Sequence, residues 1–169
     1  DAIVSGCGNS YVLTRTWTAS DNCGNTYADE QVITVLDTLV PNYVLPNDAT
    51  LYLDVSCNVD TSLATLGVPT SVTDNCGGLV TVTYNNTLVS SCEGSYEILR
   101  SWSFTDICAN VVVDTQRIIV MDTIAPNFTP PADVVLYKSV SCFVDTTSLT
   151  NGFPTGVMDN CETIVDNIT

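Results

Sequence analysis

Apolar and polar residues alternate along most of the chain. A two-residue period in segments rich in Thr, Val, Tyr and Ile is typical of half-buried β-strands, and no segment of useful length has helical spacing. In residues 96–106 the alternation places on one face Tyr96, Ile98, Arg100, Trp102 and Phe104. Strands are predicted in residues 42–46, 49–57, 67–76, 79–86, 95–106 and 111–122. Strands of this kind, separated by turn residues at short spacing, predict an all-β sandwich.

The whole pattern is an 85-residue repeat, in which position 1 corresponds to position 86. Aligned without a gap, 37 positions in 1–84 are identical to their counterparts in 86–169. The repeat relates Arg15 and Trp17 to Arg100 and Trp102. It also relates the first four cysteines, Cys7, Cys23, Cys57 and Cys76, to the last four, Cys92, Cys108, Cys142 and Cys161. Self-similarity at a fixed period indicates tandem modules.

Two proline-containing segments, "LDTLVPN" at 36–42 and "MDTIAPN" at 121–127, are the predicted joints between modules. Residues 37–121 then form one complete module. Residues 1–36 are the last part of a preceding module, and residues 122–169 are the first part of a following one. Because residue 1 falls in the middle of the repeat, we expect the sequence to be a piece of a longer secreted chain.

Charge and cysteine content limit the partners and the compartment. The net charge is −15, with 19 acidic residues, four basic residues and no histidine, which argues against nucleic acid and anionic membranes as partners. Eight cysteines without a C-x-x-C pair indicate disulfides formed in an oxidising compartment, rather than a zinc or redox site. No apolar run approaches the roughly 18 residues of a membrane span. An extracellular location, secreted or at the cell surface, is expected.

The sequence does not indicate an enzyme. It has no histidine, no glycine-rich phosphate loop, and no Ser or Cys beside a plausible neutral base. A pair of carboxylates could in principle hydrolyse a glycosidic bond. This interpretation is disfavoured, because the chain has 19 acidic residues on a repeated scaffold and an active site does not need an array. No catalytic residue is predicted, and no cofactor is required.

Arg15 and Arg100 are predicted to be structural together with Trp17 and Trp102. On the strand in 96–106, Arg100 and Trp102 fall on the core-facing side. Since a lone buried guanidinium is costly, Arg100 should either stack on the indole of Trp102 or pair with a carboxylate.

These residues carry a family resemblance: Tyr-x-x-x-Arg-x-Trp-x-x-x-Asp-x-Cys-x-Asn, then Val-x-Asp-Thr-x-x-Pro, then an Asp-Asn-Cys triplet. The chain resembles the hyalin-repeat (HYR-like), immunoglobulin-like modules found in tandem in giant Bacteroidota surface proteins, including gliding-motility adhesins. The resemblance implies disulfide-stapled immunoglobulin-like β-sandwiches in a long extracellular array. Ala109 departs from the family pattern, which usually has a glycine there, as at Gly24. A further pair of cysteines common in relatives is also absent.

Four cysteines in one module allow three pairings, which the sequence alone does not settle. The resemblance favours Cys57–Cys76 and Cys92–Cys108, because equivalents of Cys57 and Cys76 tend to occur together in relatives. Applied to the partial modules, this gives Cys7–Cys23 and Cys142–Cys161. The alternative scheme crosses the sandwich, with Cys57–Cys92 and Cys76–Cys108. It stays open because a straight strand would hold Cys92 and Cys108 far apart.

Asp37, Asp74 and Asp106 form the candidate metal site. If the loops of a sandwich meet the joint, their oxygens could clamp a calcium ion between two modules. The competing interpretation is that each Asp caps its own turn. It is favoured because no dense D-x-D-x-D run occurs. Glycosylation sequons occur at Asn85, Asn127 and Asn167.

The expected function is a non-catalytic structural and adhesive repeat that acts as a stiff spacer in a mechanical fibre. The alternative is a module whose loops bind a glycan or a protein. The expected partners are neighbouring modules of the same chain. Other copies of the chain, joined through edge strands into a filament, are a further possibility.

Overall fold

The computed structural model describes residues 1–90, 94–147 and 151–161. Almost all of the regular structure is β. In chain order the strands are β1 (Ala2–Ser5), β2 (Tyr11–Ser20), β3 (Thr26–Val35), β4 (Asn42–Val44), β5 (Ala49–Tyr52), β6 (Thr70–Thr73), β7 (Thr81–Ser90), β8 (Tyr96–Thr105), β9 (Val111–Met121), β10 (Asn127–Thr129) and β11 (Thr155–Met158). A short helix, α1, spans Leu63–Leu66. Every strand predicted from the alternating pattern is present, which confirms the all-β prediction.

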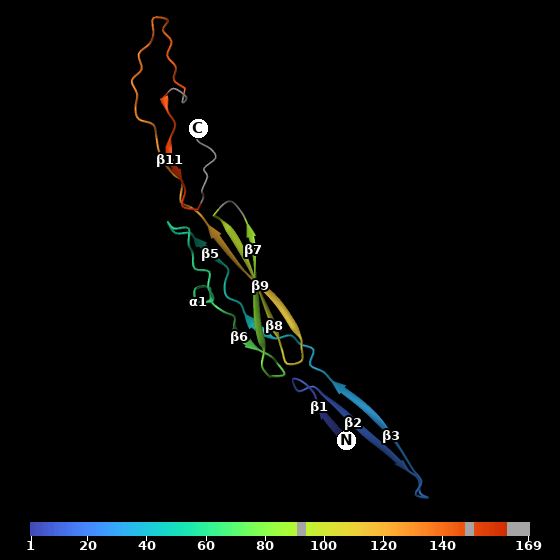
Figure 1. Ribbon diagram of the computed structural model, residues 1–169. Coiled ribbons are helices and arrows are strands. Elements are labelled where there is room, and N and C mark those ends of the chain that lie inside the picture. Colours follow the sequence, from blue (N-terminus) through green and yellow to red (C-terminus); the bar gives the residue numbers. More distant parts are fainter. Residues whose placement is uncertain (91–93, 148–150, 162–169) are drawn as a thin grey trace. The chain divides into compact units, whose positions relative to one another are not determined.

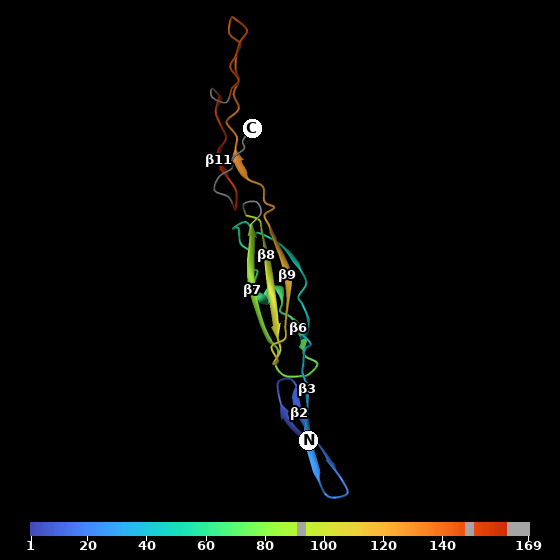
Figure 2. The same ribbon diagram turned by 90° about the vertical axis from the view of Figure 1, so that its right-hand side faces the viewer.

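Within the described parts of the chain the strands form four sheets. The largest has the order β5-β9-β8-β7, and β7, β8 and β9 run side by side in both views (Figures 1 and 2). Its β5 strand pairs in parallel with the end of β9, from Ala49 opposite Ile118 to Tyr52 opposite Met121. The other sheets are β1-β2-β3, β4-β6 and β10-β11.

The sheets repeat with the period of the sequence. β4 pairs with β6 through Asn42 opposite Thr73 and Val44 opposite Thr70. β10 pairs with β11 through the equivalent positions one period later, Asn127 opposite Met158 and Thr129 opposite Thr155. The strands of the β1-β2-β3 sheet likewise correspond to β7, β8 and β9. We call residues 1–36, 37–121 and 122–169 the first, second and third copies; these boundaries stay a prediction.

Strand β8 has the predicted inward face. The side chains of Ile98, Arg100, Trp102 and Phe104 are buried, while those between them are partly exposed. Tyr96, at the start of the same face, is partly exposed. The two-residue period of the sequence therefore identified the inner face of this strand correctly.

The structure divides into two compact units, which we describe separately. Unit 1 comprises residues 1–48, 61–87 and 99–117. In it Tyr43 of β4 stacks on Phe104 of β8, with ring centroids 4.0 Å apart, so the two-stranded sheet covers the larger one as in a sandwich. Unit 2 comprises residues 49–60, 88–98 and 118–169. Its buried apolar side chains are Leu53, Ile98, Ile118 and Val120.

Among the described residues, no helix has the length and apolar character that crossing a membrane requires.

Candidate functional site

The candidate site is the joint between successive copies, where two disulfides lie. Cys7 of the first copy is bonded to Cys108 of the second, and both belong to unit 1. Cys57 of the second copy is bonded to Cys161 of the third, and both belong to unit 2. In each pair the Cα atoms are 5.1 Å apart. Both disulfides thus connect one copy to the next instead of closing a loop within one copy.

The predicted pairings within a single copy are therefore wrong. Cys7 is not bonded to Cys23, nor Cys92 to Cys108, nor Cys57 to Cys76, nor Cys142 to Cys161. The alternative scheme, Cys57–Cys92 with Cys76–Cys108, fails because Cys57 and Cys108 have other partners. Cys92 itself lies outside the described residues.

Strand geometry explains part of this correction. Cys7 and Cys23 lie beyond opposite ends of β2, whose ten residues at about 3.3 Å each hold them roughly 30 Å apart. A disulfide needs Cα atoms within about 7 Å. Each observed partner is nevertheless the counterpart, one copy later, of the predicted partner. Cys7 is bonded to Cys108, the counterpart of Cys23, and Cys57 is bonded to Cys161, the counterpart of Cys76.

Cys108 is held in a tight turn by Asp106. The Oδ1 atom of Asp106 accepts the backbone N–H groups of Cys108 and Asn110, each at 2.8 Å. Its Oδ2 atom accepts the side-chain N–H of Asn110 at 2.8 Å. Burial raises the pKa of Asp106, but hydrogen bonds from Asn110, Cys108 and Ala109 lower it, and its net pKa lies below its ordinary value. Asp106 therefore caps its own turn, as the competing interpretation of the sequence proposed.

The first joint is closely packed around its disulfide. The backbone N–H of Asp37 donates to Ser10 Oγ at 2.8 Å, and Asn110 Nδ2 donates to the carbonyl oxygen of Asp37 at 3.2 Å. Gly8 has φ +47, and a Cβ atom there would lie 2.9 Å from Cys108 Sγ and 3.0 Å from Asp37 Oδ2. A residue without a side chain is thus required where the two copies meet.

The second joint repeats one of these contacts. The backbone N–H of Asp122 donates to Ser95 Oγ at 2.9 Å, as Asp37 does to Ser10. Asn160 Nδ2 donates to the carbonyl oxygen of Asp54 at 3.1 Å, which adds a hydrogen bond beside the Cys57–Cys161 disulfide. The contact between a joint aspartate and a serine therefore recurs at equivalent positions of the repeat.

Two of the three predicted calcium ligands come together. Asp37 and Asp74 lie with Cys76 in a group whose potential ligand atoms are all within 4.8 Å of one another, and Asp106 is not part of it. The Oδ2 atoms of Asp37 and Asp74 are buried and have no hydrogen-bond partner among the described residues. Burial and the neighbouring Asp37 carboxylate raise the pKa of the Cys76 thiol, which keeps its proton at neutral pH. Calcium at this joint stays a prediction.

The two arginines occupy equivalent positions with different exposure. Arg100 is buried, and it donates to Asn86 Oδ1 at 3.0 Å and to the carbonyl oxygen of Thr61 at 2.7 Å. Its guanidinium lies over the ring of Tyr84, 5.5 Å from the centroid. The predicted choice between the Trp102 indole and a carboxylate was therefore wrong for Arg100, whose guanidinium donates to two neutral oxygens and lies over the ring of Tyr84.

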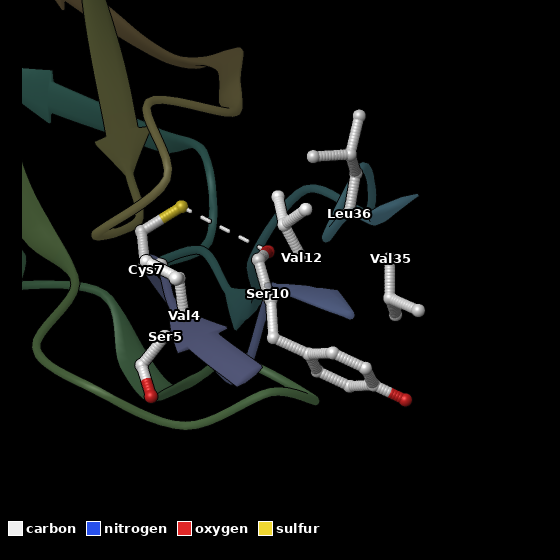
Figure 3. Close-up of a pocket in the computed structure, with 9 residues that line it drawn as sticks. Val4, Ser5, Cys7, Ser10, Val12, Val35 and Leu36 are labelled. Atoms are coloured by element: carbon white, nitrogen blue, oxygen red, sulfur yellow. Dashed lines mark hydrogen bonds between the residues drawn. The ribbon is translucent and has the colours of Figure 1, made fainter. Parts of the chain in front are cut away.

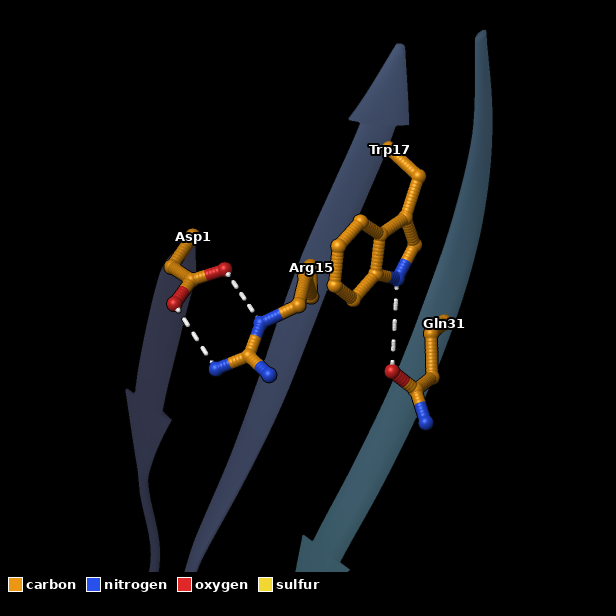
Figure 4. Close-up of polar contacts among 4 residues, drawn as sticks. All are labelled: Asp1, Arg15, Trp17 and Gln31. Atoms are coloured by element: carbon orange, nitrogen blue, oxygen red, sulfur yellow. Dashed lines mark hydrogen bonds and ion pairs between the residues drawn. The ribbon is translucent and has the colours of Figure 1, made fainter. Parts of the chain in front are cut away.

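Arg15 makes both of the contacts that were considered for Arg100. Figure 4 shows its guanidinium paired with the carboxylate of Asp1, at 3.0 and 3.1 Å, and lying beside Trp17. The guanidinium carbon is 5.7 Å from the centroid of the Trp17 ring, and the indole N–H donates to Gln31 Oε1 at 3.3 Å. Trp17 is 58% exposed, whereas Trp102 is 3% exposed. The predicted core position is therefore wrong for Trp17 and for Arg15, whose side chain is 36% exposed.

An apolar pocket of about 190 Å³ lies beside Cys7 on the β1-β2-β3 sheet. It is lined chiefly by Val4, Val12, Val35 and Leu36, with Ser10 Oγ directed toward the Cys7 sulfur (Figure 3). In the second copy β5 pairs with residues 118–121, which are the counterparts of residues 33–36. The pocket thus borders the place that a β5 strand occupies in the complete copy, which explains its apolar lining without a ligand.

The candidate glycosylation residues Asn85 and Asn127 are both exposed, on β7 and β10. Asn167 lies outside the described residues. Modification of these residues stays a prediction.

Comparison with protein families gives one match. Residues 46–119 match the family described as "HYR-like domain with 4 cysteines". Neither the curated proteins nor the solved structures gave a match. The match confirms the HYR-like resemblance over that segment. With the disulfides and the β-sandwich, it indicates an extracellular, adhesion-type repeat module of immunoglobulin-like fold. The Bacteroidota and gliding-motility setting stays a prediction.

Proposed function

We propose that the chain is a non-catalytic, load-bearing spacer of an extracellular adhesive array, in which disulfides join each module to the next. The observation that carries the proposal is the Cys7–Cys108 disulfide, which connects positions 101 residues apart and crosses the joint at Asp37. The Cys57–Cys161 disulfide supports it, since it crosses the next joint in the same direction.

The two disulfides enclose overlapping stretches of chain. They therefore limit how far the segment from Cys7 to Cys161 can extend under force. Between Cys7 and Cys161 the backbone runs through parts of all three copies. The shortest covalent path is much shorter, because the stretch from Cys7 to Cys57 leads directly through a disulfide to Cys161. At about 3.5 Å per extended residue, the limit is roughly 17 nm when the chain is oxidised and roughly 54 nm when it is reduced.

Single-molecule stretching between handles at the two ends of the 169-residue chain tests the proposal. The expected result is that reductant lengthens the fully extended Cys7–Cys161 segment by about 36 nm, the length of the chain released between Cys57 and Cys161. The matched control is Cys23→Ser, which removes an unbonded thiol and should extend like the wild type. An oxidised chain that stretches as far as the reduced one would refute the load-bearing function.

A binding role for the loops is the second candidate, because exposed loops of immunoglobulin-like modules often carry ligand sites. It is favoured here only by the exposed turns at the ends of the sheets, such as the turn between β2 and β3. Glycan-array binding by the 169-residue chain would support it. Filaments of several chains would instead appear as species larger than the monomer in light scattering.

A further inference from the structure

We infer that every thiol left unpaired in the described residues forms a disulfide with a neighbouring copy of the repeat, so that each joint of the array carries two disulfides. The unpaired cysteines are Cys23, Cys76 and Cys142. This extends the proposed function, because it takes the chain as one stretch of a longer array.

The repeat contains a bonded counterpart for each free cysteine. Cys23 corresponds to Cys108, which is bonded to Cys7. Cys76 corresponds to Cys161, which is bonded to Cys57, and Cys142 corresponds to Cys57 itself. The four bonded cysteines therefore represent all four cysteine positions of the repeat, each once.

Each free cysteine also has the same local geometry as its bonded counterpart. Asp21 Oδ1 accepts the backbone N–H groups of Cys23 and Asn25, each at 2.9 Å. Asp106 does the same for Cys108 and Asn110 at 2.8 Å. The turn that presents the bonded Cys108 is thus already formed around the free Cys23.

Cys76 and its bonded counterpart Cys161 also share their local hydrogen bonds. The backbone N–H of Cys76 donates to Asp74 Oδ1 at 2.9 Å, and that of Cys161 donates to Asp159 Oδ1 at 3.0 Å. The neighbouring Asn side chain lies 3.1 Å from the sulfur in both copies.

Cys142 reproduces the backbone of Cys57. Cys57 has φ +58 and Cys142 has φ +60, and each backbone N–H donates at 2.9 Å to a carbonyl oxygen three residues earlier. Since a positive φ is costly for a residue other than glycine, its recurrence indicates the same local arrangement in both copies and not chance. Cys23 and Cys142 are also exposed, which leaves their sulfurs accessible to a partner.

The pairing rule follows from the two observed bonds. The counterparts of Cys7 and Cys57 bond forward to the next copy, and those of Cys108 and Cys161 bond back to the previous one. Cys23 and Cys76 therefore bond to the preceding copy, at its Cys7 and Cys57 positions. Cys142 bonds to the following copy at its Cys76 position.

Each bond forms when two thiols lose two protons and two electrons. The electrons reduce the disulfide of a thiol-disulfide oxidoreductase, whose S–S bond breaks to give a dithiol as the new S–S bond forms. In such an array the shortest covalent path would use only the stretch between the Cys7 and Cys23 positions of each copy, instead of the whole repeat. At about 3.5 Å per residue this limits extension to about 6 nm per module, against about 30 nm without the disulfides.

Disulfide mapping of the natural chain, purified without reductant, tests the inference. Pepsin digestion at acid pH suits the mapping, because it suppresses thiolate exchange and does not depend on the four basic residues of this segment. The expected result is linked peptides that join Cys23 and Cys76 to the preceding copy and Cys142 to the following one. Free thiols at these positions, links within one copy, or links between two chains would overturn it.

A cysteine variant gives a second test, in which the intact Cys7–Cys108 disulfide shows that the protein has folded. Cys76→Ser in the natural chain should expose one new thiol, that of its partner in the preceding copy, while the Cys7–Cys108 peptide stays linked. Unchanged thiol content would contradict the inference. Failure of the proposed function appears separately, since stretching of the 169-residue chain depends only on the two disulfides described.

Discussion

Arg100 donates through Nε to Asn86 Oδ1 at 3.0 Å, and at the equivalent position of the first copy Arg15 donates through Nε to Asp1 Oδ1 at the same distance. The contact is thus repeated although the acceptor changes from a neutral amide to a carboxylate. What differs is exposure, since Arg100 is 2% exposed and the side chain of Arg15 is 36% exposed. The two copies therefore allow the same arginine hydrogen bond to be compared in a buried and in a solvent-exposed environment.

Arg100→Ala should destabilise the protein by about 3 kcal/mol. The substitution leaves the carbonyl oxygen of Thr61 without this donor in the interior, and each buried unsatisfied group costs about 1–3 kcal/mol. Arg15→Ala is the control, because an exposed ion pair contributes about 0–1 kcal/mol. Urea unfolding followed by tryptophan fluorescence measures both. Equal losses for the two variants would contradict the assignment of Arg100 to the core.

Cys7→Ser should destabilise unit 1 by about 2–5 kcal/mol. Its disulfide closes a loop of 101 residues, and loops of that size constrain the unfolded chain strongly. Cys23→Ser should leave stability unchanged, since Cys23 is exposed and unbonded in this chain. Denaturant titration with and without reductant measures the effect. The wild type in reductant should match the Cys7→Ser variant in the unfolding of this unit, and a difference between them would argue against the Cys7–Cys108 pairing.

The Asp106 turn predicts a dependence of stability on pH. Because the folded-state pKa of Asp106 lies below its ordinary value, the carboxylate contributes stability above the unfolded pKa of about 3.9. That contribution is lost as the pH falls through the lower folded pKa. Asp106→Asn should therefore be less stable than the wild type near pH 7, with the difference shrinking below about pH 4. Unfolding curves at several pH values check this, and a difference that persists undiminished in acid would contradict it.

Calcium binding at the first joint is tested by its effect on thermal stability. The carboxylates of Asp37 and Asp74 lie close enough to share an ion, and sites in extracellular modules bind calcium at about 10⁻⁴–10⁻³ M. Millimolar calcium should then raise the melting temperature of the wild type but not of Asp37→Asn. Magnesium is the control cation, because it prefers a more rigid octahedral site. An equal rise with both cations, or in the variant as well, would mean general screening of the acidic chain.

The sequence predicted the fold because its signals are local and repeated. Alternation along residues 96–106 identified Ile98, Arg100, Trp102 and Phe104 as buried, since side chains in a strand point alternately to its two faces. The 85-residue period of the sequence recurs in the structure, where β4-β6 and β10-β11 pair through equivalent residues. Turn residues such as Asp21 and Asp106 could be recognised from the same short pattern.

The disulfides could not be predicted from the same signals, because pairing depends on which turns meet in space. The repeat positions that bond to each other could be inferred from the sequence. The local pattern around Cys108, however, does not say whether its partner lies in the same copy or in the preceding one. Two facts in the sequence pointed to the answer. A ten-residue strand separates Cys7 from Cys23, which excludes a local bond, and the period supplies an identical turn one copy later.

Ala109 is strained where its counterpart is a glycine. Ala109 has φ +67 and Gly24 has φ +85, each in the turn that follows a capping aspartate. A left-handed conformation costs an ordinary residue about 1–2 kcal/mol. Ala109→Gly should remove this strain, offset by about 0.4–1 kcal/mol from the greater freedom of the unfolded chain. The net expectation is a stabilisation of about 0.5–1 kcal/mol.

Gly24→Ala is the reverse experiment at the equivalent position. No atom lies within 4 Å of a Cβ built on Gly24, so only the backbone conformation opposes the substitution. It should cost about as much as Ala109→Gly gains, although the site is exposed to solvent. Denaturant titration of the two variants and of the double variant measures this. Because the strain at each turn is local, the two effects should add, and the double variant should match the wild type within about 0.5 kcal/mol.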